Sequence, residues 1–134
     1  MLEDLQSFFS DSAGGLDAVD AIKERIWSAE EDYARTVYKA GVVLGGHICN
    51  DPAANALIQC IRAPSKIGRR SAIHAVFHLA EWMPACREQI LGALQQASNE
   101  DPEPLLRAFA AGIAQDIEAK ETEHVMEPLF PDEP

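Results

Sequence analysis

Apolar side chains recur along this chain at steps of three and four residues, which is the spacing of an amphipathic α-helix. The clearest series is Leu16, Val19, Ile22, Ile26 and Trp27. Glycines and prolines interrupt the pattern, and the sequence Asp-Pro marks two expected helix starts, at residues 51 and 101. No segment alternates apolar and polar residues as a strand does. We therefore expect an all-α fold of about seven helices, the first at residues 2–10, and no sheet.

The apolar pattern also repeats itself along the chain. Segments that begin at Arg35, Arg70 and Arg107 keep small or apolar residues at offsets two, five and six, and they lie 35 and 37 residues apart. A second series lies between them, since Leu57, Ile58, Cys60 and Ile61 recur 33 positions later as Ile90, Leu91, Ala93 and Leu94. A period of this length that holds two helical patterns is typical of stacked antiparallel helix pairs.

The segment Asp101-Pro-Glu-Pro-Leu-Leu-Arg107, followed by small residues, is similar to the start of a HEAT or armadillo repeat. The resemblance implies a short HEAT-like solenoid of antiparallel helix pairs. We expect one helical domain over residues 1–134, divided into N-terminal helices in 1–28, three helical-hairpin units in 29–130 and a tail in 131–134. The first two units lack Asp-Pro before their arginine, so an irregular helical bundle is the alternative architecture.

Acidic residues outnumber basic ones by 22 to 11, which gives a formal net charge of −11. This charge opposes binding to nucleic acid and to anionic membranes, and it favours a partner with a basic surface. Four cations do cluster within nine residues, and we expect them to pair with acidic neighbours such as Glu31 or Glu103: Arg62, Lys66, Arg69 and Arg70.

Three cysteines, Cys49, Cys60 and Cys86, form no Cys-x-x-Cys pair and occupy apolar helical positions, so we interpret them as reduced core residues. The chain does not begin with a basic segment followed by an apolar run, and it has no uninterrupted apolar stretch of about 18 residues. We therefore expect a cytoplasmic protein that neither enters nor binds a membrane.

His74-Ala-Val-Phe-His78 places two imidazoles one helical turn apart, and Glu81 lies a further turn along the same stripe. This spacing could present three metal ligands. A fourth ligand would have to come from His47 or His124, which nothing in the pattern brings near. We expect these histidines at the edge of the core, with no metal, no cofactor and no enzymatic activity. A small metal-binding helical domain or enzyme centred on His74, His78 and Glu81 is the alternative.

The second helices of such pairs usually line a concave surface. If Leu57 and Ile61 face the core, polar side chains occupy the opposite stripe, and the same register continues into the later units. The predicted partner-binding residues are Asn55, Gln59, Arg62, Glu88, Gln95, Glu123 and Glu127. We expect a non-catalytic helical-repeat module that binds a protein with a basic surface. An acidic inhibitor or immunity-type protein fits this charge and size.

Overall fold

A computed structural model describes residues 16–28 and 34–119 of the chain. These residues contain no strand and form six α-helices: α2 (Leu16–Trp27), α3 (Ala34–Val42), α4 (Asp51–Cys60), α5 (Lys66–Trp82), α6 (Arg87–Glu100) and α7 (Pro104–Glu118). A π-helical turn, Val43–Ile48, continues α3, and a 3₁₀ turn, Pro84–Cys86, precedes α6. The all-α fold is confirmed. Six helices are found where about seven were expected, and the expected helix at residues 2–10 lies outside the described residues.

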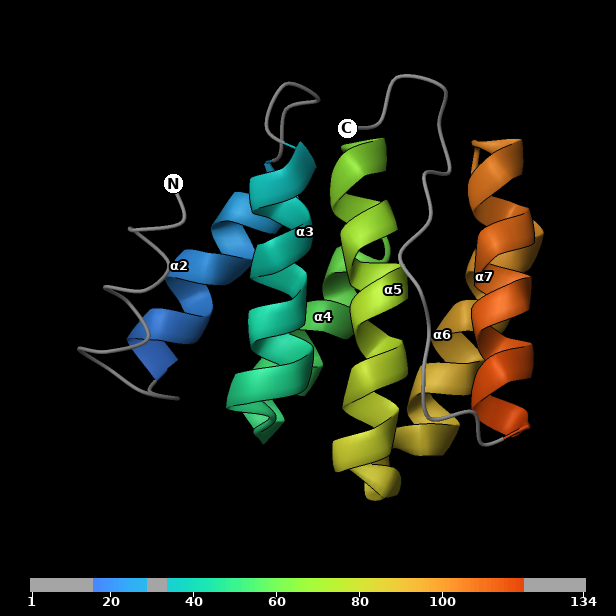
Figure 1. The fold of residues 1–134 in the computed structure, drawn as a ribbon. Coiled ribbons are helices and arrows are strands. Elements are labelled where there is room, and N and C mark those ends of the chain that lie inside the picture. The colour runs from blue at the N-terminus through green and yellow to red at the C-terminus, as the bar shows by residue number, and fades with distance from the viewer. Residues whose placement is uncertain (1–15, 29–33, 120–134) are drawn as a thin grey trace.

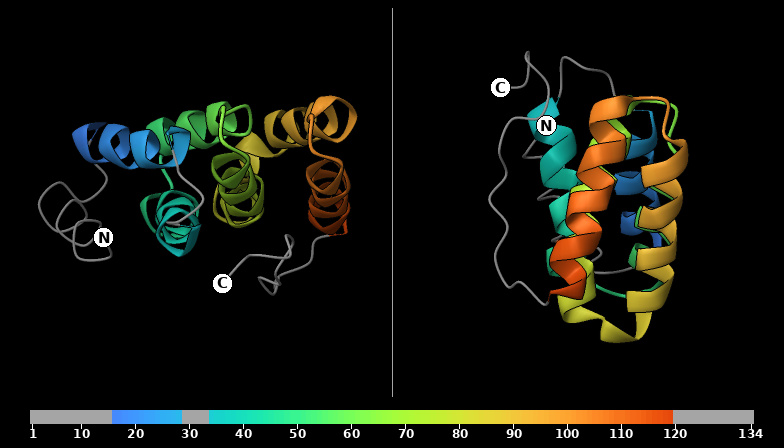
Figure 2. Two further views of the ribbon diagram at one scale, coloured as in Figure 1. Left: turned by 90° about the horizontal axis from the view of Figure 1, so that it is seen from above. Right: turned by 90° about the vertical axis from the view of Figure 1, so that its right-hand side faces the viewer.

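The helices form two layers. Figure 2 shows α2, α4 and α6 in one layer and α3, α5 and α7 in the other. Within the second layer, α5 contacts α3 on one side and α7 on the other, and all three helices run from the top of Figure 1 to its bottom. The segments that begin at Arg35, Arg70 and Arg107 therefore share one layer.

Helix α5 is the central element of the core. Every residue from Ile67 to Phe77 is buried, and the helix packs against α2, α3, α4, α6 and α7. Glycine permits the closest of these approaches. A Cβ atom placed on Gly45 would lie 2.5 Å from the carbonyl oxygen of Ala75, and one placed on Gly68 would overlap the carbonyl oxygen of Ile26. These backbones can approach so closely only because neither glycine has a side chain.

The second series of apolar residues lies largely in the core. Leu57, Ile61 and Leu94 are all 3 % exposed or less, whereas Leu91 is only partly buried against the core. Leu57 and Leu94 therefore lie on the faces of α4 and α6 that meet the second layer. Leu91 lies at the margin of its helix face, one turn before the fully buried position.

Two helix starts differ from the expected positions. Helix α4 is capped by Asn50 and not by Asp51, because the Asn50 side chain accepts a hydrogen bond from the backbone N–H of Ala53 at 2.9 Å. Helix α7 begins at Pro104 with Glu103 as its capping residue, so Asp101 lies ahead of the helix. Because Glu103 caps α7, the Asp101 carboxylate can make other contacts.

Candidate functional site

A pocket with a volume of about 460 Å³ opens where the turn after α4 meets the last turns of α6. We call it the corner pocket. It is lined by Ile61, Arg62, Ala63, Pro64, Arg69, Ala93, Gln96, Ala97, Glu100, Asp101 and Pro102. These residues come from two successive expected units, so the pocket exists only where the two units meet.

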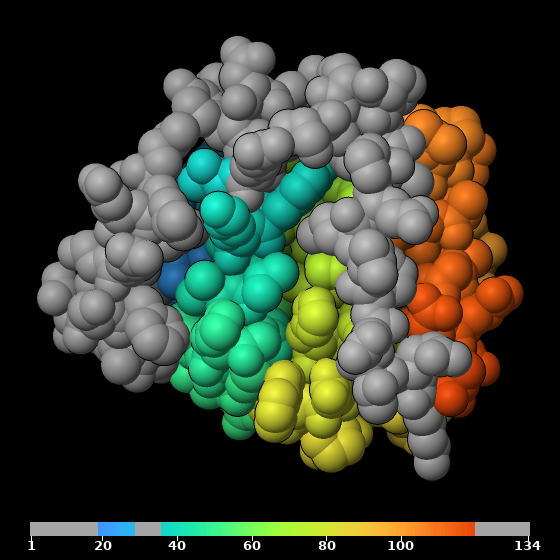
Figure 3. All heavy atoms as spheres, viewed as in Figure 1, coloured from blue at the N-terminus to red at the C-terminus, as the bar shows by residue number. Residues whose placement is uncertain are grey.

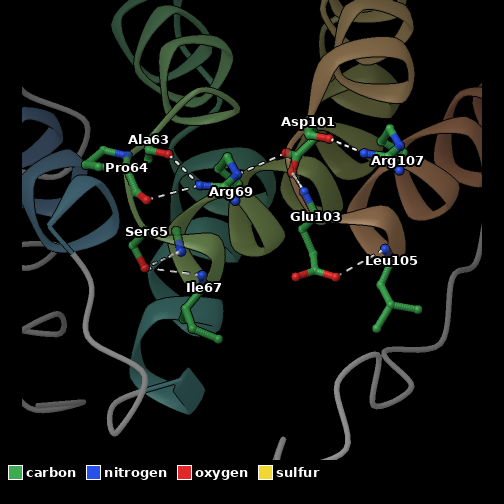
Figure 4. Close-up of polar contacts among 10 residues, drawn as sticks. Ala63, Pro64, Ser65, Ile67, Arg69, Asp101, Glu103, Leu105 and Arg107 are labelled. Atoms are coloured by element: carbon green, nitrogen blue, oxygen red, sulfur yellow. Dashed lines mark hydrogen bonds and ion pairs between the residues drawn. The ribbon is translucent and has the colours of Figure 1, made fainter.

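A buried ion pair forms part of the pocket wall. The Arg69 Nε atom donates to Oδ2 of Asp101 at 2.9 Å, and the two side chains are only 11 % and 2 % exposed (Figure 4). Arg69 Nη1 also donates to the carbonyl oxygens of Ala63 at 3.0 Å and Pro64 at 3.1 Å. The Arg69 side chain therefore ties the turn after α4 to the turn after α6. Hydrogen bonds to a charged group in a dry setting are stronger than neutral ones.

Asp101 also organises the turn that leads into α7. Its Oδ1 atom accepts a hydrogen bond from the backbone N–H of Glu103 at 2.9 Å, and its carbonyl oxygen accepts one from Arg107 Nη1 at 2.7 Å (Figure 4). An aspartate that binds the backbone two residues ahead stabilises a tight turn. Both carboxylate oxygens of Asp101 are thus engaged by the protein itself.

Five of the seven predicted partner-binding residues lie in the described part of the chain, and all five are exposed: Asn55, Gln59, Arg62, Glu88 and Gln95. They lie on α4, just after it, or on α6, which belong to one layer. Gln59 accepts a hydrogen bond from the Lys23 side chain of α2. Of the five, only Arg62 lines the corner pocket. Glu123 and Glu127 lie outside the described residues.

Sequence reasoning missed the pairing of Arg69 with Asp101. Arg69 was expected to pair with an acidic neighbour such as Glu31 or Glu103. It does pair with an acidic residue, but the residue is Asp101, and Glu31 lies outside the described residues. The two paired residues are 32 positions apart, close to the repeat period of 33 to 37. That period was therefore the available signal, because residues one repeat apart lie at equivalent places on neighbouring units.

Arg70 is buried between two aromatic rings. It is 1 % exposed, and its guanidinium carbon lies 4.3 Å from the ring centre of Phe109 and 5.1 Å from that of Tyr38. An arginine over aromatic faces gains from the electron-rich rings. Arg70 therefore joins α3, α5 and α7 inside the second layer.

The histidine stripe of α5 runs from the core to the surface. His74 is 3 % exposed, which is deeper than the expected position at the core edge, while His78 is partly buried and Glu81 is exposed. The rings of His74 and His78 meet edge to face with centroids 5.0 Å apart. Over residues 16–28 and 34–119, no three histidine, cysteine or carboxylate side chains gather in a metal-binding group.

The three cysteines differ in environment. Cys60 is fully buried, and burial raises the pKa of its thiol from 9.0 to about 12. Cys49 and Cys86 are only partly buried, so they are less central than expected. Burial also raises the pKa of Cys49. A thiol with a raised pKa holds little of the reactive thiolate at neutral pH, so Cys60 has the character of a structural residue.

The chain matches no protein-family model, no curated protein and no solved structure. Among the helices that the structure describes, none has the length and apolar character needed to cross a membrane. The corner pocket and the exposed residues of α4 and α6 are therefore the features that bear on function.

Proposed function

We propose that this protein is a non-catalytic helical module that binds a protein partner through the layer containing α4 and α6. The observation that carries the proposal is the corner pocket, where Arg62, a predicted contact residue, borders a pocket built by two successive helix pairs. Surface pockets of about 300 to 1,000 Å³ are the usual places where proteins hold ligand groups. We propose a short HEAT-like solenoid as the framework, since stacks of helix pairs commonly present extended binding surfaces.

The net charge bears on the nature of the partner. Residues 16–28 and 34–119 carry ten basic and eleven acidic residues, so nearly all of the excess negative charge lies in residues 1–15, 29–33 and 120–134. We propose that those segments attract a partner with a basic surface, as an acidic inhibitor or immunity-type protein would. Charge complementarity of this kind acts mainly on the association rate.

Affinity capture from native lysate, followed by mass spectrometry and titration with the captured protein, tests the proposal. Glu88→Lys on α6 should weaken binding of that protein by roughly tenfold or more. Glu118→Lys on α7 is the matched control, because it reverses the same charge at an exposed helical position in the other layer. Equal binding by the two variants would show that α6 is not part of the interface, and it would contradict the proposal.

A separate experiment tests whether the negative charge of the chain selects the partner. Reversal of Glu123 and Glu127 to lysine should slow association more than it speeds dissociation, and added salt should diminish the difference, because the Debye length is about 8 Å at physiological ionic strength. An association rate that is indifferent to both changes would show that the partner is not selected by its basic surface.

The metal-centred alternative gains no specific support from the described side chains. Its three proposed ligands are spread from a nearly buried position to an exposed one along α5.

A further inference from the structure

The most exposed large apolar side chain in the described part of the protein lies at the end of the central helix. Trp82, the last residue of α5, is 63 % exposed, whereas Leu105 is 40 % exposed and Trp27 is 37 % exposed. Figure 3 shows the end of α5 and the turn that follows it, in yellow, at the lower edge of the molecule. Tryptophan is among the residue types most enriched at the positions that dominate binding between proteins.

The helix end beside Trp82 is negatively charged. Within the described ranges, the exposed carboxylate of Glu81 makes no hydrogen bond or ion pair. The last turn of α5 contains no basic residue, although the carbonyl groups that end a helix favour a cation. Arg87, at the start of α6, forms no ion pair with Glu81, and the ring of His78 packs edge to face on Phe77. The end of α5 therefore has a negative charge that is open to a partner.

The other tryptophan of the chain allows a comparison. Trp27 is the last residue of α2, as Trp82 is of α5. The last turn of α2, however, contains Arg25 beside Glu24, so the two charges there cancel, and Ser28 Oγ also donates to Oε1 of Glu24 at 3.4 Å. Both helix ends carry an exposed indole, but only that of α5 combines the indole with uncompensated negative charge in the described residues.

A cation suits this combination better than an apolar group does. The face of an indole attracts a cation that lies within about 6 Å of the ring centre. An apolar group placed on Trp82 would remove water from the Glu81 carboxylate without giving it a donor, which costs free energy. Arginine fits better than lysine, because its planar guanidinium can stack on a ring while its N–H groups donate to a carboxylate. A second copy of this chain would bring the same net charge of −11, which opposes the contact.

We propose that the end of α5 binds an arginine side chain of a protein partner. The guanidinium lies over the indole of Trp82 and donates to the carboxylate of Glu81. The turn Pro84–Cys86 leads from this site directly into α6, so the site adjoins the layer to which we assign partner binding. The assignment of the arginine to a basic partner rests on the function proposed above, whereas the site itself can be tested without that partner.

Titration of the ¹⁵N-labelled full chain with small peptides tests the site. The probe is acetyl-glycyl-arginyl-glycinamide, whose only charge is the guanidinium, and its citrulline counterpart has nearly the same shape without the charge. The indole N–H signals of Trp82 and Trp27 report on the two helix ends, and a Trp27→Phe variant assigns them. We expect the arginine peptide to shift the Trp82 signal and not the Trp27 signal, with a Kd on the order of 10 mM for so small a contact. The citrulline and lysine peptides should shift it roughly threefold less at equal concentration.

Two variants make the titration specific. Glu81→Gln should reduce the Trp82 shift roughly threefold, since it removes an exposed carboxylate that pairs with the guanidinium. Glu118→Gln is the matched control and should leave the shift unchanged. It removes an exposed carboxylate from the last turn of α7, which also lacks a basic residue there but has no aromatic residue beside the glutamate. Equal losses in the two variants would show general charge attraction and would overturn the proposal.

Other outcomes also overturn it. Equal shifts with arginine and citrulline would mean that the indole accepts any apolar group, and equal shifts with arginine and lysine would mean that any cation suffices. A Trp82 signal that moves with protein concentration alone would make a second copy the occupant. No shift with any peptide would mean that the end of α5 holds no arginine.

The partner obtained by affinity capture supplies a separate measurement. Trp82→Leu should weaken its binding roughly tenfold, because the variant keeps an apolar side chain but loses the aromatic face. Unchanged binding would overturn the proposal for the end of α5 and leave the binding module intact. The comparison of Glu88→Lys with Glu118→Lys decides whether α6 belongs to the interface, so a failure of the proposed function would be recognised independently.

Discussion

Removal of the Asp101 carboxylate should be the most damaging single change at the corner pocket. Asp101→Ala leaves the Arg69 side chain, which is only 11 % exposed, without its counter-ion, and it deprives the Glu103 N–H of its acceptor. Breaking a buried ion pair from one side costs about 3 to 5 kcal/mol. Because Arg69 keeps its two bonds to backbone carbonyls, we expect the lower end of this range, about 3 kcal/mol.

Urea unfolding followed by circular dichroism measures this effect. With an m-value of about 1.5 kcal/mol per molar urea for a chain of this size, a loss of about 3 kcal/mol moves the midpoint by about 2 M. Glu100→Ala is the matched control, since it removes an exposed carboxylate next in the chain and should change stability by less than about 0.5 kcal/mol. The double variant Arg69→Met, Asp101→Ala should lose less than the sum of the two single variants, because it leaves no buried charge unpaired.

The reasoning fails if the Asp101→Ala midpoint moves by less than about 0.5 M at unchanged m-value, or if the two single losses simply add. Either result would mean that water solvates the Arg69 guanidinium as well as the Asp101 carboxylate does. The ion pair would then contribute little to the rigidity of the pocket wall.

Three further predictions concern the core. Leu94→Ala should cost about 2 to 5 kcal/mol and Leu91→Ala clearly less, as measured by urea midpoints; similar losses would mean that α6 is rotated about its axis. Gly45→Ala should destabilise the protein by about 1 to 3 kcal/mol, because the new methyl group meets a backbone carbonyl of α5. Gly92→Ala should stabilise it by up to about 1 kcal/mol, because a Cβ atom at this helical position has no atom within 4 Å. The thermal midpoint of each variant checks these values. Cys60 should react with iodoacetamide after the other two cysteines. Because burial raises the pKa of its thiol from 9.0 to about 12, only the unfolded chain ionises this thiol between pH 9 and 12, so the free energy of unfolding should fall over that range. An equal fall in a Cys60→Ala variant would contradict this prediction.

The sequence was most informative where burial determines residue type. The spacing of the apolar residues predicted where the helices lie. The period of 33 to 37 residues indicated that the helices that begin near Arg35, Arg70 and Arg107 are equivalent, and these helices do share one layer. It was less informative about helix ends. Asn50 and Asp51 are both good capping residues, and only the backbone geometry decides between them.

Polar residues inside the molecule could not be placed from the pattern. Arg69, Arg70 and His74 belong to one helix that is enclosed on several sides, and a charged side chain in a sequence carries no sign of whether it is solvated or buried. The two arginines were expected to pair with acidic neighbours and His74 to lie at the edge of the core, and neither expectation gave the depth of burial. Arg69 pairs with Asp101 because the turn ahead of α7 places the Asp101 carboxylate beside it, and these two residues are 32 positions apart in the chain.

The central position of α5 has a consequence for the order in which the protein can fold during synthesis. The apolar faces of α2, α3 and α4 all meet α5, so the first half of the chain has no complete core until residue 82 has been made. Helix α7 likewise packs against α5, which is already present when α7 emerges, whereas α6 packs mainly against α7. Synthesis from the N-terminus therefore delays the first half of the core until α5 has been made, and α6 acquires its main neighbour only when α7 follows. If the ribosome pauses before α5 is made, the apolar sides of α2, α3 and α4 that face α5 stay exposed to water. If it pauses after α5, those sides can already be buried.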